Sequence, residues 1–213
     1  MNTNTIGQKE ILDEIKKAEL EERPANFSNK EITDFSVPLE KVKFGLNFEN
    51  SKITGQLFLG EVEINGDLNL ANTEINGSIY LGKSNIKGNV VLEKSKINGA
   101  INLVGAKVLG NVMARELIVN GFVSLTKAEI TGNAIFEATN IDNANYEDLT
   151  VRGDLFFDTA IIRGNLNLNK TSVDGLVDLD DVEIGGDLIL TGATSKKGEI
   201  DTTMAKIKGR KII

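Results

Sequence analysis

The segment Ile64-Asn-Gly-Asp-Leu-Asn-Leu70 is echoed eleven residues later by Ile75-Asn-Gly-Ser-Ile-Tyr-Leu81 and again by Ile97-Asn-Gly-Ala-Ile-Asn-Leu103. Glycine recurs every eleven residues at positions 55, 66, 77, 88, 99, 110, 121 and 132. The repeating unit is small-x-Ile-x-Gly-x-Leu-x-Leu-x-x, in which apolar residues lie two positions apart. That spacing is the period of a strand with one buried face, whereas a helix needs spacings of three and four. We expect the glycine at a bend or bulge that divides each unit into two short strands.

Parallel stacking of coils explains this regularity better than a series of hairpins does. A coil of one unit is too narrow for its inward Leu and Ile side chains, so we expect two units, or 22 residues, in each coil. The sequence therefore predicts an all-β fold, a parallel β-solenoid (β-helix) of about 22-residue coils built from 11-residue repeats, with an N-terminal capping α-helix. The handedness of the solenoid stays open.

Three parts of the chain differ in pattern. Residues 1–24 are predicted to form an amphipathic capping helix, residues 25–51 irregular first coils, and residues 52–213 the β-solenoid repeat domain. Within the last part the glycine series reaches Asn143, slips by one residue and resumes at Gly153. The repeat domain is thus expected to continue through this point with a one-residue irregularity.

The N-terminal segment has the pattern of a helix. Thr5 and Gln8 have the spacing of a capping box, and Ile11 and Ile15 share one helical face. Because the first coil of a solenoid exposes strand edges and an open core, the simplest role of this helix is to cover them. A helix that binds a partner or a membrane surface is the alternative.

Composition excludes several kinds of chemistry. The 213 residues include no Cys, His or Trp, and the formal net charge is −7. This excludes zinc sites of Cys and His, thiol nucleophiles, Ser-His-Asp triads and disulfides. The negative charge opposes direct binding to nucleic acid. The sequence shows neither a membrane span nor a signal peptide, so we expect a cytoplasmic protein that is not an enzyme and has no cofactor.

Two stretches imitate functional motifs. Gly77-Ser-Ile-Tyr-Leu-Gly82-Lys83-Ser84 matches the phosphate-loop pattern, but that motif needs a helix after the loop, and here strand pattern follows. We interpret the match as a coincidence. Six acids crowd into the segment from Asp174 to Asp187, and they are read either as a solvated acidic face or as carboxylates for a hard cation. No other metal site is predicted.

Two surfaces are candidate contacts. With 22-residue coils, one face is expected to carry a continuous apolar stripe formed by Val91, Met113, Ile135 and Phe156. An apolar stripe on a surface often marks a contact, although ordinary strand propensity or a covering loop also explains it. The second surface is a C-terminal association end with Ile207, Lys211 and Ile213. Six basic residues lie among the last eighteen residues of the chain. Either their charge repulsion prevents pairing at the exposed strand edge, or they accompany a head-to-head dimer, or they bind an acidic partner.

The chain resembles right-handed β-solenoids of the pentapeptide-repeat type. The resemblance covers Ile11-Leu-Asp-Glu-Ile15 through Pro24-Ala-Asn-Phe27, and units such as Gly66-Asp-Leu68-Asn-Leu70, although that family repeats every five residues and this chain every eleven. Strings such as Ile75-Asn-Gly77-Ser-Ile79 are also similar to bactofilins, bacterial β-helical proteins that polymerise into filaments. The first resemblance implies that the chain acts as an acidic DNA mimic on topoisomerases, and the second implies a polymer-forming structural protein.

Two functions follow from these observations as hypotheses. The first is a non-enzymatic structural or protein-interaction scaffold, a rigid rod that contacts a protein partner or itself, as a homodimer or an end-to-end oligomer, through the C-terminal end or the apolar stripe. The alternative is a DNA mimic that binds a DNA-processing enzyme such as a topoisomerase. The sequence does not nominate a particular partner.

Overall fold

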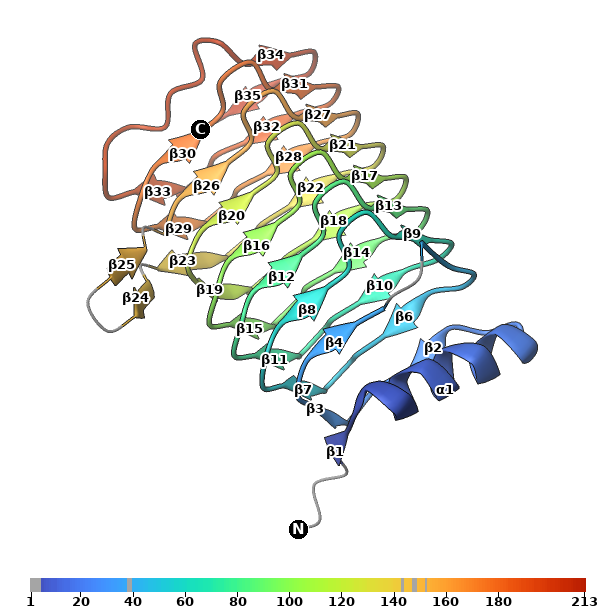
Figure 1. Cartoon of the computed structure of the whole chain (residues 1–213). Coiled ribbons are helices and arrows are strands. Elements are labelled where there is room, and N and C mark those ends of the chain that lie inside the picture. The colour runs from blue at the N-terminus through green and yellow to red at the C-terminus, as the bar shows by residue number, and fades with distance from the viewer. Residues whose placement is uncertain (1–4, 38–39, 143, 147–148, 152) are drawn as a thin grey trace.

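The chain is a parallel β-solenoid of about nine coils with a helix across its N-terminal end (Figure 1). The computed structural model describes residues 5–37, 40–142, 144–146, 149–151 and 153–213. Strands that are 22 residues apart pair in register, so that Glu74 lies between Lys52 and Lys96. The predicted fold class, coil length and N-terminal helix are confirmed.

Each coil has four sides, and the strands on each side form one parallel sheet, named A to D. Sheet A contains β1 (Thr5–Ile6), β3 (Glu31–Ile32), β7 (Lys52–Ile53), β11 (Glu74–Ile75), β15 (Lys96–Ile97), β19 (Ile118–Asn120), β23 (Asn140–Asp142), β29 (Ser172–Val173) and β33 (Thr194–Ser195). Sheet B contains β2 (Ala25–Asn26), β6 (Leu46–Asn47), β10 (Leu68–Asn69), β14 (Val90–Val91), β18 (Val112–Met113), β22 (Ala134–Ile135), β28 (Leu166–Asn167), β32 (Leu188–Ile189) and β35 (Lys211–Ile212). Sheet C contains β4 (Phe35–Ser36), β8 (Leu57–Phe58), β12 (Ile79–Tyr80), β16 (Ile101–Asn102), β20 (Val123–Ser124), β26 (Leu155–Phe156) and β30 (Val177–Asp178). Sheet D contains β5 (Lys41–Val42), β9 (Glu63–Ile64), β13 (Asn85–Ile86), β17 (Lys107–Val108), β21 (Glu129–Ile130), β27 (Ile161–Ile162), β31 (Glu183–Ile184) and β34 (Lys206–Ile207).

One eleven-residue unit supplies two of these strands and two corners. In the unit around Gly77, β11 ends in the buried Ile75, the chain bends at the glycine, and β12 begins with the buried Ile79. The glycine therefore divides the unit into two strands, as the sequence predicts. Glycine is needed at this bend because neighbouring coils pack closely along the solenoid axis. A Cβ on Gly77 would lie 2.5 Å from the carbonyl oxygen of Gly55 in the preceding coil.

The second corner of each unit is a two-residue turn whose second residue is left-handed. In most units that residue is not glycine: φ is 60° at Glu61, 55° at Lys83 and 52° at Thr159. Left-handed backbone is strained for residues with a Cβ, most of all for a β-branched one. The repeat pattern does not signal this position, because its residue types vary from unit to unit.

Helix α1 (Gln8–Leu20) closes the N-terminal end of the core. The helix lies across the first coils (Figure 1). Ile11, Ile15 and Ala18 are almost completely buried and belong to the hydrophobic core. The expected capping box of Thr5 and Gln8 is wrong. Thr5 lies in β1, and the carboxylate of Glu10 instead accepts the N–H of Gly7 at 3.2 Å.

The irregularity near residue 143 is an insertion rather than a slip. Strands β24 (Ala144–Tyr146) and β25 (Leu149–Val151) form an antiparallel hairpin that projects from the side of the solenoid (Figure 1). Asn143, on which the expected slip falls, lies outside the described residues. The coil that contains the hairpin needs 32 residues, as the hydrogen bond from Asn165 back to Asn133 shows. Beyond the hairpin, Gly153 accepts the N–H of Gly175 and the coils continue.

Candidate interaction surfaces

The structure assembles three of the four stripe residues. Val91 pairs with Met113, and Met113 pairs with Ile135, in adjacent strands of sheet B. Their side chains are partly exposed on the outer face of that sheet. The next residue of the column is Asn167, so the apolar stripe covers three coils. We call Val91, Met113 and Ile135 the sheet B stripe.

Phe156 does not belong to this stripe. It lies in sheet C, where it pairs with Ser124 on one side and Asp178 on the other. The hairpin is the reason, because the longer coil shifts every later residue relative to a strict 22-residue count. The expectation of a four-residue column is therefore wrong at its last member.

Both flanks of the sheet B stripe are polar and internally bonded. On one flank, Asn89, Asn111 and Asn133 form a ladder in which each Oδ1 accepts the backbone N–H of the same position in the next coil, at 2.8–2.9 Å. On the other flank, Arg115 lies 2.6 Å from Glu93 and 3.5 Å from Glu137. Since these groups are engaged with one another, the apolar side chains are the part of this face that has most to gain from a contact.

The C-terminal candidate residues fall into two places. Lys211 and Ile213 line one side of a hollow of about 490 Å³, together with Leu190 and Ile200. Ile213 is 82% exposed. Ile207 instead lies in sheet D and lines a different hollow. Association through these residues stays a prediction.

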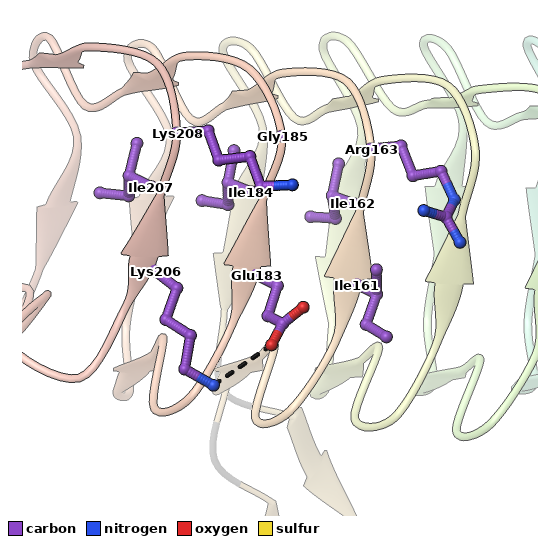
Figure 2. Close-up of a pocket in the computed structure, with 9 residues that line it drawn as sticks. All are labelled: Ile161, Ile162, Arg163, Glu183, Ile184, Gly185, Lys206, Ile207 and Lys208. Carbon is purple, nitrogen blue, oxygen red and sulfur yellow. Dashed lines mark hydrogen bonds and ion pairs between the residues drawn. The ribbon is translucent and has the colours of Figure 1, made fainter.

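A hollow of about 460 Å³ lies on sheet D, where Ile207 pairs with Ile184 of the preceding coil and Ile184 pairs with Ile162 of the coil before it (Figure 2). Gly185, which has no side chain, lies between Arg163 and Lys208 in the lining, and the Lys208 side chain extends toward it (Figure 2). Lys206 pairs with Glu183 at 3.2 Å and closes the other edge. This surface is basic, and it contains part of the basic C-terminal segment found in the sequence.

The phosphate-loop pattern is a coincidence of the repeat. Ile79 and Leu81 are fully buried, and Lys83 lies in a turn with its Nζ 3.3 Å from Glu61. The helix of the described chain, α1, lies far back in the sequence at Gln8–Leu20. The segment therefore offers no helix N-terminus for a phosphate.

The acidic segment is partly neutralised by bases. Asp174 pairs with Lys196 at 2.5 Å, and Asp187 pairs with Arg210 at 2.8 Å. Asp180 lies among other acids, and repulsion from Asp178 is the largest effect that raises its pKa. Among the residues that the structure describes, no group of three or more carboxylates is arranged to hold a metal ion.

The comparisons with known proteins leave the classification at the level of the fold. No protein-family model, curated protein or solved structure matches this chain. The chain is a parallel β-solenoid, and the resemblance to pentapeptide-repeat proteins and bactofilins stays a sequence-based expectation. Across the described ranges, no helix is long and apolar enough to cross a membrane.

Sequence reasoning missed one feature of the surface. Phe58 and Tyr80 stack on the outer face of sheet C, with ring centroids 5.0 Å apart and 5° between the ring planes. Their separation of 22 residues is a signal in the sequence, because it places both rings at the same point of consecutive coils.

Proposed function

We propose that the chain is a non-enzymatic protein-interaction scaffold, a rigid rod that binds a second protein surface through the sheet B stripe. The observation that supports this is the column of Val91, Met113 and Ile135, three partly exposed apolar side chains in register on consecutive coils. A sheet whose strands are all hydrogen-bonded to their neighbours changes shape little on binding, which lowers the entropy cost of association. A second copy of the chain is the partner to test first.

The double variant Met113→Lys/Ile135→Lys tests this proposal. We expect the wild-type mass to rise with concentration in sedimentation velocity and the double variant to stay monomeric. Ile118→Lys is the matched control, because Ile118 is an isolated apolar residue, 39% exposed, on sheet A. If the two lysine variants and the wild type show the same mass and capture the same proteins from the native cell extract, the stripe is not a contact surface.

The second candidate function is a DNA mimic that binds a DNA-processing enzyme. The mutual repulsion around Asp180 supports it, because acids held close together produce a strong local negative potential. The surface of sheet D argues against a DNA mimic, because Lys41, Lys87 and Lys107 form ion pairs there with glutamates and neutralise their charge. In a gyrase supercoiling assay, inhibition by the wild type that is lost in Asp178→Asn/Asp180→Asn would favour the mimic over the scaffold.

A further inference from the structure

The stacked rings of Phe58 and Tyr80 leave one aromatic face free. The two residues are neighbours in sheet C, and the residue that follows Tyr80 in the same column is Asn102. One face of the Tyr80 ring is covered by Phe58 at 5.0 Å. Because Asn102 is short and not aromatic, the stack ends there, and the second face of Tyr80 is open toward the next coil.

A hollow of about 450 Å³ lies beside this open face. Its volume falls within the roughly 300–1,000 Å³ that is usual for small-molecule sites. Gly77, Ala100 and Gly121 are small residues in the lining and leave room for the hollow, and Phe122 is a second aromatic residue that lines it. The remaining lining residues are Gln56, Asn76, Ser78, Tyr80 and Asn102. Two aromatic residues, Tyr80 and Phe122, therefore line a hollow that is otherwise bordered by small and neutral polar residues.

Several of these polar groups are oriented and still able to bond. The Oδ1 of Asn76 accepts a hydrogen bond from Asn98 at 3.3 Å, and the Oδ1 of Asn102 accepts the N–H of Val104 at 2.9 Å. These bonds leave the Nδ2 of each amide as a donor. Within the described residues, neither Nδ2 has a hydrogen-bond partner, and the same holds for the Gln56 amide and the Tyr80 hydroxyl.

The charge of the hollow restricts its ligand. None of its nine lining residues is charged, so it offers no counter-ion to a phosphate, a carboxylate or an ammonium group. The net charge of −7 on the chain adds to the penalty for an anion. A neutral ligand with one flat apolar face and several hydroxyl groups fits these features.

We propose that this hollow binds the ring of a neutral sugar, as one unit of an oligosaccharide or polysaccharide. The C–H groups on one face of the sugar ring lie against the electron-rich face of Tyr80 and continue the stack. The sugar hydroxyls accept hydrogen bonds from the Nδ2 groups of Asn76 and Asn102. The amide of Gln56 can both donate a hydrogen bond to a hydroxyl and accept one from it. Since the lining includes no carboxylate, the site binds the sugar and does not cleave it.

A nucleobase is the nearest competitor, because it also stacks on tyrosine. Its polar atoms lie in the ring plane along an edge, whereas the amides of Gln56, Asn76 and Asn102 come from three consecutive coils around the hollow. A nucleotide also brings a phosphate, for which the lining has no cation. The observations therefore favour the sugar.

The test uses the full chain with cellohexaose, chitohexaose and the corresponding insoluble polysaccharides. We expect retention on at least one polysaccharide, and ¹H–¹⁵N shift changes at the side-chain amides of Asn76 and Asn102 on titration with its soluble oligomer. Tyr80→Ala is expected to weaken binding at least tenfold, and Tyr80→Phe, which keeps the stacking face, less than threefold.

Phe156→Ala is the matched control, because Phe156 is a partly exposed aromatic residue on the same sheet, beyond Ser124. It is expected to bind as the wild type does. The proposal is overturned if no sugar shifts the two amides, if Phe156→Ala weakens binding as much as Tyr80→Ala, or if adenosine monophosphate shifts them where the sugars do not. None of these outcomes depends on the sheet B stripe, which lies on another face.

Discussion

Gly77 lies directly over Gly55 of the preceding coil, and a Cβ at position 77 would be 2.5 Å from the carbonyl oxygen of Gly55. The same closeness recurs between Gly99 and Gly77, where the distance is 2.7 Å. Glycine at this corner is therefore required by the spacing of the coils, since no other residue lets the two backbones approach in this way.

Gly77→Ala is accordingly expected to lower the free energy of unfolding by about 2 kcal/mol or more, because the methyl group forces neighbouring coils apart. Gly82→Ala is the control, since its Cβ would lie 3.6 Å from the nearest atom, the carbonyl oxygen of Val104. That variant is expected to gain about 0.4–1 kcal/mol from the reduced entropy of the unfolded chain. Urea unfolding measures both, and equal effects would show that coil spacing is not the cause.

Two buried serines at equivalent positions are expected to respond in opposite ways to alanine. The Oγ of Ser95 donates a hydrogen bond of 2.5 Å to the carbonyl of Leu70, whereas the buried Oγ of Ser51 has no hydrogen-bond partner among the residues that the structure describes. Ser95→Ala is expected to cost about 1 kcal/mol, and Ser51→Ala to be neutral or stabilising, because it removes an unsatisfied hydroxyl. Thermal unfolding of the two variants is the measurement, and a larger loss for Ser51→Ala contradicts this assignment.

Glu14 ties the capping helix to the first coil in a pH-dependent way. Its burial acts to raise its pKa, but hydrogen bonds from Arg23 and from the N–H of Asn26 outweigh this and hold the pKa below its ordinary value of 4.5. A carboxyl whose pKa is lower in the folded state stabilises the fold above the unfolded pKa, and this contribution is lost as the pH falls.

Glu14→Gln is thus expected to cost about 1 kcal/mol at pH 7 and progressively less as the pH falls below about 4.5. Chemical unfolding at pH 7 and at pH 3 measures this difference. The control is Glu116→Gln, at an exposed turn residue, which is expected to leave stability unchanged at both values. A cost for Glu14→Gln that is the same at both pH values would rule out the linkage.

Thr159 occupies the left-handed turn position with φ of 52°, where its branched side chain is strained. Thr159→Asn is expected to raise the free energy of unfolding by about 1 kcal/mol, because asparagine tolerates this conformation. Asn72→Thr makes the reverse change at an equivalent turn, where φ is 54°, and is expected to lose a similar amount. Differential scanning calorimetry of the pair provides the comparison. Changes of the same sign in both variants would contradict it.

The repeat is strong enough for its spacing to predict most of the architecture. Glycines eleven residues apart, together with apolar residues two apart, predict the coil length and the pairing of Val91 with Met113. The position of Phe156 was not predictable in this way, because it depends on how many residues the chain spends outside the coils between Asp142 and Gly153. Counting along the sequence does not distinguish an inserted hairpin from a coil of unusual composition.

Local chemistry limited the other predictions. The spacing of Thr5 and Gln8 fits a capping box, yet Thr5 pairs with Glu31 and extends sheet A, so that Gly7 is the N-cap of the helix that begins at Gln8. Left-handed residues such as Glu61 and Lys83 carry no signal in their type, since the turn is imposed by the strands on either side. The hollow beside Tyr80 forms where particular coils have small residues such as Ala100 in the lining. A consensus of the repeat does not show such differences between individual coils.

The projecting hairpin shows where the solenoid tolerates a change in chain length. The amide ladder passes from Asn133 to Asn165 at 2.8 Å, as it does between Asn111 and Asn133, although the intervening loop of chain is longer. Chain length at this corner is therefore decoupled from the stacking that holds the rod together. The chain between Asp142 and Gly153 is therefore a site that tolerates insertions. Evolution or protein engineering can replace the inserted segment there while the solenoid coils stay the same.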